Sequence, residues 1–128
     1  MNALLDTNIV IAFLKNEPVI VRKTASLKRM NISIITVGEL FYGARNSTKQ
    51  AENLSVFRNF FEECFILHIT EKTAEAYAEI RASLKKKGTP IPENDIWIAA
   101  TAKAGGYTLI SRDIHLMKIG KSIRLETW

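Results

Sequence analysis

The sequence predicts an α/β fold in which a mainly parallel β-sheet is covered by helices. Short apolar segments alternate with longer amphipathic segments along the whole chain. The short segments are apolar at consecutive positions, which is typical of parallel strands buried on both faces. No repeat, low-complexity stretch or linker interrupts the 128 residues, so we expect a single domain, 1–128.

The first half of the chain contains three predicted strands separated by helices. The strands are expected over 3–5, 32–35 and 65–67. Helices are expected over 9–15, from Pro18 to about Arg29, from Thr36 to about Ala44, and over 47–63. Asp6-Thr7-Asn8 supplies cap-type residues before the first helix, and Pro18 suits the first turn of the second. Thr36-x-x-Glu39 matches the capping-box pattern at the start of the third helix.

The second half repeats this alternation after a chain-breaking segment. A helix is expected over 70–87, and Gly88-Thr89-Pro90-Ile91-Pro92 ends it. The next helix begins at Asn94 or Asp95, runs to Lys103 and is closed by Gly105-Gly106. Strands follow over 107–110 and 122–125, with a turn and a short helix over 111–117.

The composition indicates a cytoplasmic protein that has no membrane segment. Hydrophobic residues make up 47% of the chain, but no apolar run approaches the roughly 20 residues that a membrane helix needs. The N-terminus lacks the basic region of a signal peptide, and Asp6 interrupts its apolar stretch. Cys64 is the only cysteine, which excludes an internal disulfide and favours a buried thiol. The net charge of +5 favours a polyanionic partner such as nucleic acid.

Four acidic residues lie where strands end or helices begin. Asp6 ends the first strand, Asp113 follows the fourth, Asp95 opens a helix and Glu39 lies one turn into another. In a parallel sheet, all these points fall at one edge, where α/β folds bind their ligands. We therefore expect the four carboxylates to converge on one pocket.

Converging carboxylates repel one another, so the pocket should retain a proton or attract a cation. Mg²⁺ is the expected ion and Mn²⁺ the expected substitute, because both prefer oxygen ligands. A zinc site is poorly supported, since His68 and His115 lack ligand-like spacing. An ion held by carboxylates can lower the pKa of water and hold a phosphate oxygen, which is the chemistry of phosphodiester hydrolysis.

A structural alternative stands beside this hypothesis. Aspartate is a favoured helix N-cap, so Asp6, Asp95 and Asp113 could each serve only as caps. Glu39 could serve only as the capping-box partner of Thr36. Such a protein would be a catalytically silent binding protein. A phosphoacceptor signalling module is a second alternative, but no aspartate lies between Asp6 and Asp95 to accept the phosphate.

The chain resembles PIN domains, and within them the VapC-type toxins of prokaryotic toxin–antitoxin pairs. Four segments in order carry the resemblance: Leu4-Leu5-Asp6-Thr7-Asn8, then Ser33 to Gly43 in the pattern S-x-x-T-x-x-E-L-x-x-G, then Asn94 to Ala100, then Thr108 to Asp113. The second segment is the most specific. Ser111 stands where many relatives have threonine, and His115-Leu116 follows the last acid where an aromatic residue is common.

The resemblance implies a PIN-like fold with a five-stranded parallel sheet and a metal-dependent endoribonuclease that leaves a 5′-phosphate. Asp6, Glu39, Asp95 and Asp113 match the acidic quartet of the family, and Thr7 and Asn8 match the small polar positions beside the first acid. The implied partners are an RNA substrate (transfer or ribosomal RNA), a VapB-like antitoxin, and a second copy of the chain in a homodimer or larger toxin–antitoxin assembly. DNA cleavage by the same acids stays an alternative.

Two further features have more than one interpretation. Arg112 beside Asp113 is a candidate RNA contact or half of a surface ion pair. An aromatic set is expected to lie mostly in the core, with a groove for an amphipathic partner segment as the alternative. Its members are Phe13, Phe41, Tyr42, Phe57, Phe60 and Phe61.

Overall fold

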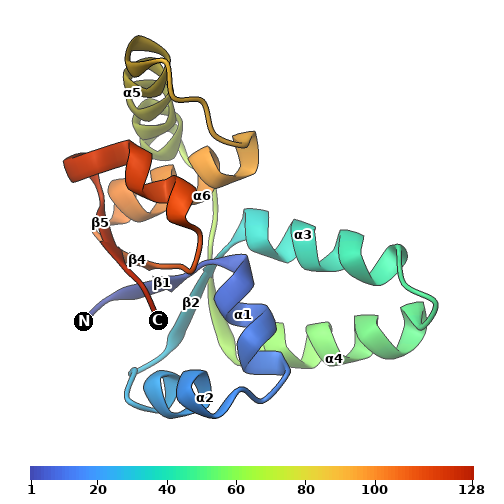
Figure 1. The fold of residues 1–128 in the computed structure, drawn as a ribbon. Coiled ribbons are helices and arrows are strands. Elements are labelled where there is room, and N and C mark those ends of the chain that lie inside the picture. The colour runs from blue at the N-terminus through green and yellow to red at the C-terminus, as the bar shows by residue number, and fades with distance from the viewer.

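Five short strands form one parallel sheet at the centre of the molecule (Figure 1). The structure is a computed structural model that describes all residues, 1–128. The strands are β1 (Ala3–Leu5), β2 (Met30–Ser33), β3 (Cys64–Leu67), β4 (Thr108–Ile110) and β5 (Arg124–Glu126). Their order in the sheet is β3-β2-β1-β4-β5, and every neighbouring pair is parallel. The predicted α/β class and five-stranded parallel sheet are therefore confirmed.

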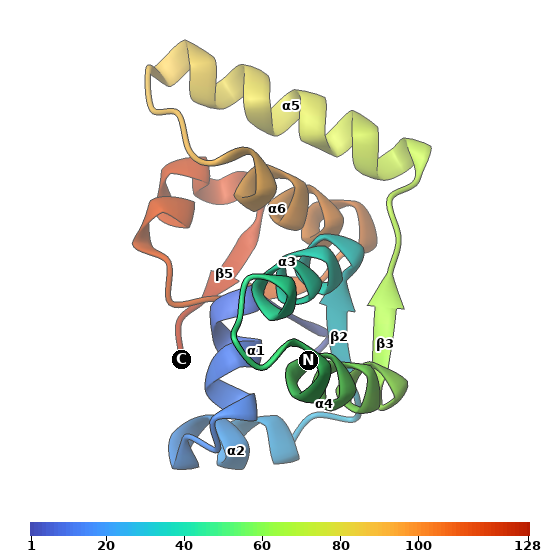
Figure 2. The same ribbon diagram turned by 90° about the vertical axis from the view of Figure 1, so that its right-hand side faces the viewer.

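Helices cover both faces of this sheet (Figures 1 and 2). One face is covered by α1 (Thr7–Leu14), α2 (Pro18–Ala25), α3 (Ile34–Arg45) and α4 (Gln50–Glu62). The other face is covered by α5 (Glu71–Lys87), α6 (Glu93–Gly105) and the 3₁₀ segment η1 (Ile114–Ser122). None of the helices combines the length and the apolar character that crossing a bilayer requires.

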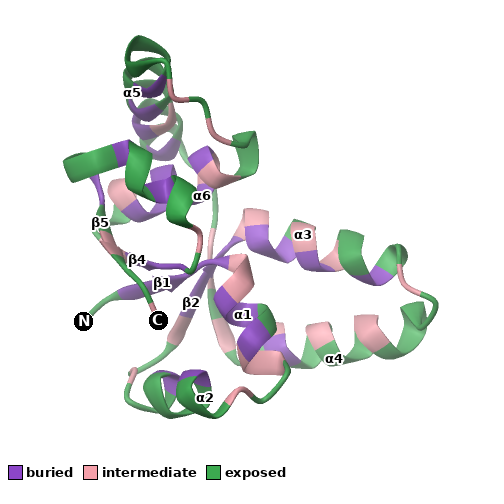
Figure 3. Cartoon of the chain, in the orientation of Figure 1, coloured by how far each residue is buried: buried purple, intermediate pink, exposed green.

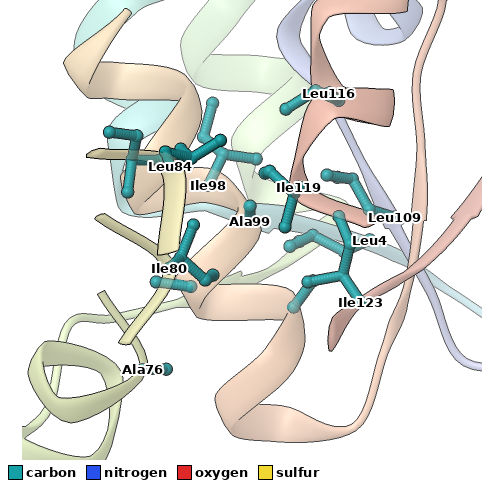
Figure 4. Close-up of a cluster of buried hydrophobic side chains, with 13 residues drawn as sticks. Leu4, Ala76, Ile80, Leu84, Ile98, Ala99, Leu109, Leu116, Ile119 and Ile123 are labelled. Carbon is teal, nitrogen blue, oxygen red and sulfur yellow. The ribbon is translucent and has the colours of Figure 1, made fainter. Parts of the chain in front are cut away.

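Alternation along the strands divides the buried side chains between two cores, because successive residues of a strand face opposite sides. Leu4 and Leu109 face the core beneath α5, α6 and η1 (Figure 4). Leu5 and Ile110 face the core beneath α1 to α4. Figure 3 shows how burial concentrates on the strands and on the inner sides of the helices. The central strands are thus held rigidly from both faces.

Several element boundaries differ from the predicted ones, and the difference at α3 changes the expected cap of the helix. The β-branched run around Ile34 predicts a strand over 32–35, but β2 ends at Ser33 and Ile34 begins the helix. Ser33 is the N-cap, since its Oγ accepts a hydrogen bond from the Thr36 backbone N–H at 3.1 Å. The predicted capping box of Thr36 and Glu39 is therefore wrong, because helix formation starts one turn earlier.

The other differences shift the ends of elements by a few residues. α2 ends at Ala25 rather than near Arg29, and α4 begins at Gln50 rather than Ser47. α6 begins at Glu93, and η1 extends to Ser122 so that β5 starts only at Arg124.

The strand order creates a switch point between the two central strands. The chain leaves β1 toward β2 on one side and later returns to β4 on the other. In α/β folds the helical connections diverge at such a switch point, and ligands bind in the crevice beyond the carboxyl ends of the strands. The backbone N–H of Asp6 continues the pairing by donating to the Ile110 carbonyl at 2.9 Å. Asp6 and Ser111 thus face one another across this point.

Candidate functional site

Asp6 lies at the base of the crevice and is only 4% exposed. Its Oδ1 accepts a hydrogen bond from the Thr7 backbone N–H at 2.8 Å and so caps α1. Its Oδ2 accepts a hydrogen bond from the Ser111 hydroxyl at 2.5 Å. Burial raises the pKa of Asp6, and the nearby charges of Glu39 and Asp113 act in the same direction, while its hydrogen bonds oppose the rise. Asp6 therefore caps a helix while it lies in an environment that disfavours its charged form.

Glu39 reaches the same crevice from α3. The Thr7 hydroxyl donates to its Oε1 at 2.7 Å, and the Thr7 and Thr36 hydroxyl oxygens lie 3.0 Å apart. Thr36 is fully buried and also accepts a hydrogen bond from the Ser33 hydroxyl at 3.3 Å. A line of hydroxyl groups thus fixes Glu39 beside the end of β1. Glu39 does not cap α3, so the capping-box role that the sequence suggested for it does not explain its position.

Ser111 and Asn8 hold the loop after β4 against α1. The buried Ser111 Oγ accepts from the Asp113 backbone N–H at 2.9 Å and from the Asn8 side-chain amide at 3.3 Å. The Asn8 carbonyl oxygen accepts from the Arg112 backbone N–H at 3.3 Å. Asp113 Oδ1 accepts from the His115 backbone N–H at 2.9 Å, which makes Asp113 the cap of η1. The small polar residues therefore position both Asp6 and Asp113.

Asp95 approaches from the first turn of α6, where it caps nothing. The helix N-cap is Pro92, and no side chain forms a capping hydrogen bond. The pKa of Asp95 is raised to about 7 by burial, by the charges of Asp6, Asp113 and Glu39, and by a hydrogen bond to Asp113. This environment disfavours a charged Asp95, so a cation or a proton there would be strongly favoured.

The acids of the quartet lie near one another but do not form a ready-made chelate. No group of three or more His, Cys, Asp or Glu side chains is arranged to hold a metal ion. Burial is the largest cause of the raised pKa of Asp6 and Asp95, and charges of other members of the quartet add to it. Carboxylate and hydroxyl oxygens are the donors that Mg²⁺ and Mn²⁺ prefer. The chemistry of the donor set therefore fits a hard divalent ion.

Arg112 points away from the acids, toward α2. Its guanidinium forms two hydrogen bonds to the Glu17 carboxylate, at 2.9 and 3.0 Å, and a third to the Trp128 carbonyl at 3.1 Å. This pairing lowers the pKa of Glu17 and raises that of Arg112. Of the two interpretations that the sequence left open, the structure favours the surface ion pair.

The aromatic set is mostly packed as expected. Phe60 is buried, and Phe41 meets Phe61 edge-on with ring centroids 5.3 Å apart. Tyr42 is the exception, with 71% of its surface exposed. Tyr42 directly follows the packed Phe41. It lies three residues after Glu39, and this spacing in the sequence places Tyr42 on the same helix face as that acid. Cys64 is half-buried, and burial together with Glu63 raises the pKa of its thiol to about 12.

Comparisons with known proteins identify the relatives of this chain. A model of the PIN domain matches residues 3–122. Ribonuclease VapC2 of Haemophilus influenzae is 38% identical over 127 residues, which cover 98% of this chain and 96% of that protein. The tRNA(fMet)-specific endonuclease VapC of Salmonella typhimurium is 35% identical with the same coverage of both chains.

Solved structures are similar to this chain over its whole length. The chain aligns with a crystal structure of VapBC2 from Rickettsia felis bound to a promoter DNA fragment, with a TM-score of 0.91, 31% identity, and 100% and 99% of the two chains covered. A DNA-bound VapBC structure from Salmonella typhimurium gives a TM-score of 0.90 at 34% identity, with 100% and 98% covered. The family expected from the sequence motifs is thus confirmed: this chain belongs to the PIN domain family.

Proposed function

We propose that this chain is a Mg²⁺-dependent endoribonuclease and the toxin of a VapC-type toxin–antitoxin pair. One observation carries the proposal: carboxylates from four separate segments meet at the switch point of the sheet, and two of them cap nothing. Helix capping accounts for the positions of Asp6 and Asp113, but it does not account for those of Glu39 and Asp95. The silent binding protein, whose acids serve only as caps, is therefore the weaker alternative.

Asp6, Asp95, Asp113 and Glu39 are the residues that would hold the ion, and Mn²⁺ would serve in place of Mg²⁺. A bound divalent ion supplies two effects: it lowers the pKa of a water molecule and offsets charge on a phosphate oxygen. The quartet orients that ion, and its raised Asp95 pKa predicts that ion binding displaces a proton near neutral pH.

Thr7, Asn8 and Ser111 act as positioning residues. The Thr7 hydroxyl directs Glu39, the Ser111 hydroxyl directs Asp6, and Asn8 ties the two halves of the crevice together. Groups in this supporting role commonly change metal affinity or activity by about 10- to 100-fold when removed. They do so by holding the carboxylates in the orientation that the reaction requires.

RNA is the proposed substrate, because the relatives are ribonucleases and the net charge of +5 favours a polyanion. A relative is a tRNA(fMet)-specific endonuclease, so initiator tRNA is the first RNA to test, followed by ribosomal RNA. The VapBC neighbours support a VapB-like antitoxin as partner in the cytoplasm. We also propose a homodimer, alone or within a larger toxin–antitoxin assembly.

Cleavage by the purified chain tests this function. Wild type should cut RNA in Mg²⁺ or Mn²⁺ and stop in chelator, and should leave a DNA strand of the same sequence intact. Asp6→Asn and Asp95→Asn should each lose at least about 100-fold in activity, because each removes charge from the ion's shell. Glu79→Gln is the matched control, since its carboxylate pairs with Lys103 on the outside of α5 and α6. Equal cleavage by folded wild type and both asparagine variants would disprove the proposal.

A further inference from the structure

An open depression of about 490 Å³ adjoins the acidic crevice on the side of α3. It is lined by Ile34, Ile35, Gly38, Glu39, Tyr42 and Asn94. One wall therefore contains a member of the acidic quartet, and another contains the residue directly before Asp95. Ligand sites in proteins commonly enclose about 300–1,000 Å³, so the depression has room for a ligand of nucleotide size.

Tyr42 presents an unused aromatic surface to this depression. Its side chain is 71% exposed, whereas the neighbouring Phe41 turns inward and packs against Phe61. Residues three apart on a helix lie on the same face, so the Tyr42 ring stands beside Glu39. Packing of the fold does not require a ring at this position.

Glycine and asparagine shape the remainder of the depression. Gly38 lies one turn before Tyr42 on α3, and no atom lies within 4 Å of the place where its Cβ would stand. The floor beside the ring is therefore open. Asn94 is exposed in the first turn of α6, where its amide offers both a donor and an acceptor. A flat ring, an open floor and an amide at the edge together suit a planar heteroaromatic group.

We propose that this depression binds an unpaired nucleobase of the RNA, which stacks on Tyr42 beside the phosphate that is cut. The inference rests on the ribonuclease function proposed above. Stacking on an aromatic side chain is available to every base, and the Asn94 amide can favour one base by contacting its edge. Because a base within a duplex is not free to stack, the site selects single-stranded loops.

The test combines an activity measurement with a direct optical signal from the base. We would compare Tyr42→Leu, Tyr42→Phe and the control Phe65→Leu, which removes an exposed aromatic ring from the edge strand β3. The probe is an unstructured oligoribonucleotide with a single 2-aminopurine, moved through successive positions around the cleavage site. Binding is measured in Mg²⁺ with each substitution placed in an Asp95→Asn protein, so that the probe stays intact. Cleavage is measured with Asp95 present.

Stacking predicts that 2-aminopurine fluorescence is quenched at one position only, next to the cleaved bond. Tyr42→Leu should abolish that quenching and lower kcat/KM about tenfold, mainly through KM, since base–aromatic stacking has about this magnitude. Tyr42→Phe should keep the quenching, and Phe65→Leu should match wild type. All three proteins should melt at the wild-type temperature, because both positions are exposed.

Other outcomes would overturn the subsite. Unchanged quenching and cleavage in Tyr42→Leu would show that no base stacks there. A shift of Tyr42→Leu from dimer to monomer in sedimentation, with quenching intact, would assign the ring to a contact between two copies. Failure of the ribonuclease function itself is separate, because then wild type would not cut RNA or Asp95→Asn would cut it equally well.

Discussion

The acidic crevice has two halves that are built differently. The strand-end pair, Asp6 and Asp113, follows β1 and β4, and each member caps a helix. The helix pair, Glu39 and Asp95, lies within α3 and α6 and caps nothing. The strand-end pair contributes helix caps as well as charge, whereas the helix pair contributes charge without capping a helix. The difference separates what the fold requires from what the chemistry requires.

The largest effect should come from the pH dependence of stability at Asp95. Its pKa is raised to about 7, so the folded state binds the proton more tightly than the unfolded state does. The stabilisation is complete below pH 4 and is lost as the pH rises through 7. Since Asp95 is only half-buried, screening should limit this loss to about 1–2 kcal/mol.

Melts of metal-free protein in chelator at pH 5 and pH 8 would measure this loss. Wild type should lose more stability than Asp95→Asn between these values. If the stability of the two proteins changed with pH in parallel, the raised pKa assigned to Asp95 would be contradicted.

The capping duty can be isolated by comparing alanine with asparagine at the same position. Asparagine caps a helix nearly as well as aspartate, and both substitutions remove the charge. Asp6→Ala should therefore be about 1 kcal/mol less stable than Asp6→Asn in denaturant titrations. At Asp95 the order should reverse, with alanine at least as stable as asparagine because it is the better helix former. If Asp95→Ala were less stable than Asp95→Asn by a similar amount, the strand-end pair and the helix pair would not differ in capping.

The smallest effect concerns Arg112, which lies beside the strand-end pair but points to Glu17. Exposed ion pairs contribute little, so Arg112→Gln and Glu17→Gln should each keep an unfolding midpoint close to that of wild type. Both should cleave RNA within about twofold of wild type at every salt concentration. If Arg112 instead contacts a phosphate, only Arg112→Gln would bind RNA more weakly, and the salt dependence of its binding would become shallower by about one counterion.

The sequence predicted the class of the fold and the order of its elements because both follow from local patterns. Apolar runs define the strands, and glycines with positive φ, such as Gly88 and Gly106, end the helices where expected. The start of α3 was mispredicted because Ile34 is β-branched and suits a strand, whereas its helical state depends on the Ser33 cap.

The sequence predicted that the four acids lie near one another, but it did not predict the orientations of the side chains around them. The strand ends locate the acids, because parallel strands bring these ends to one edge. The direction of the Arg112 side chain depends on Glu17, which lies 95 residues away, and the exposure of Tyr42 depends on how Phe41 docks against α4. Contacts of this kind arise from tertiary packing, which leaves no periodic trace in the sequence.

The hydrogen bond from Ser111 to Asp6 joins residues 105 positions apart. During synthesis, the amino-terminal half of the crevice emerges from the ribosome long before β4 exists, and domains generally fold as units. A growing chain therefore holds Asp6 and Glu39 without Asp95 and Asp113 until translation of the domain is nearly finished. A chain that ends before Asp113 therefore lacks the complete set of four carboxylates.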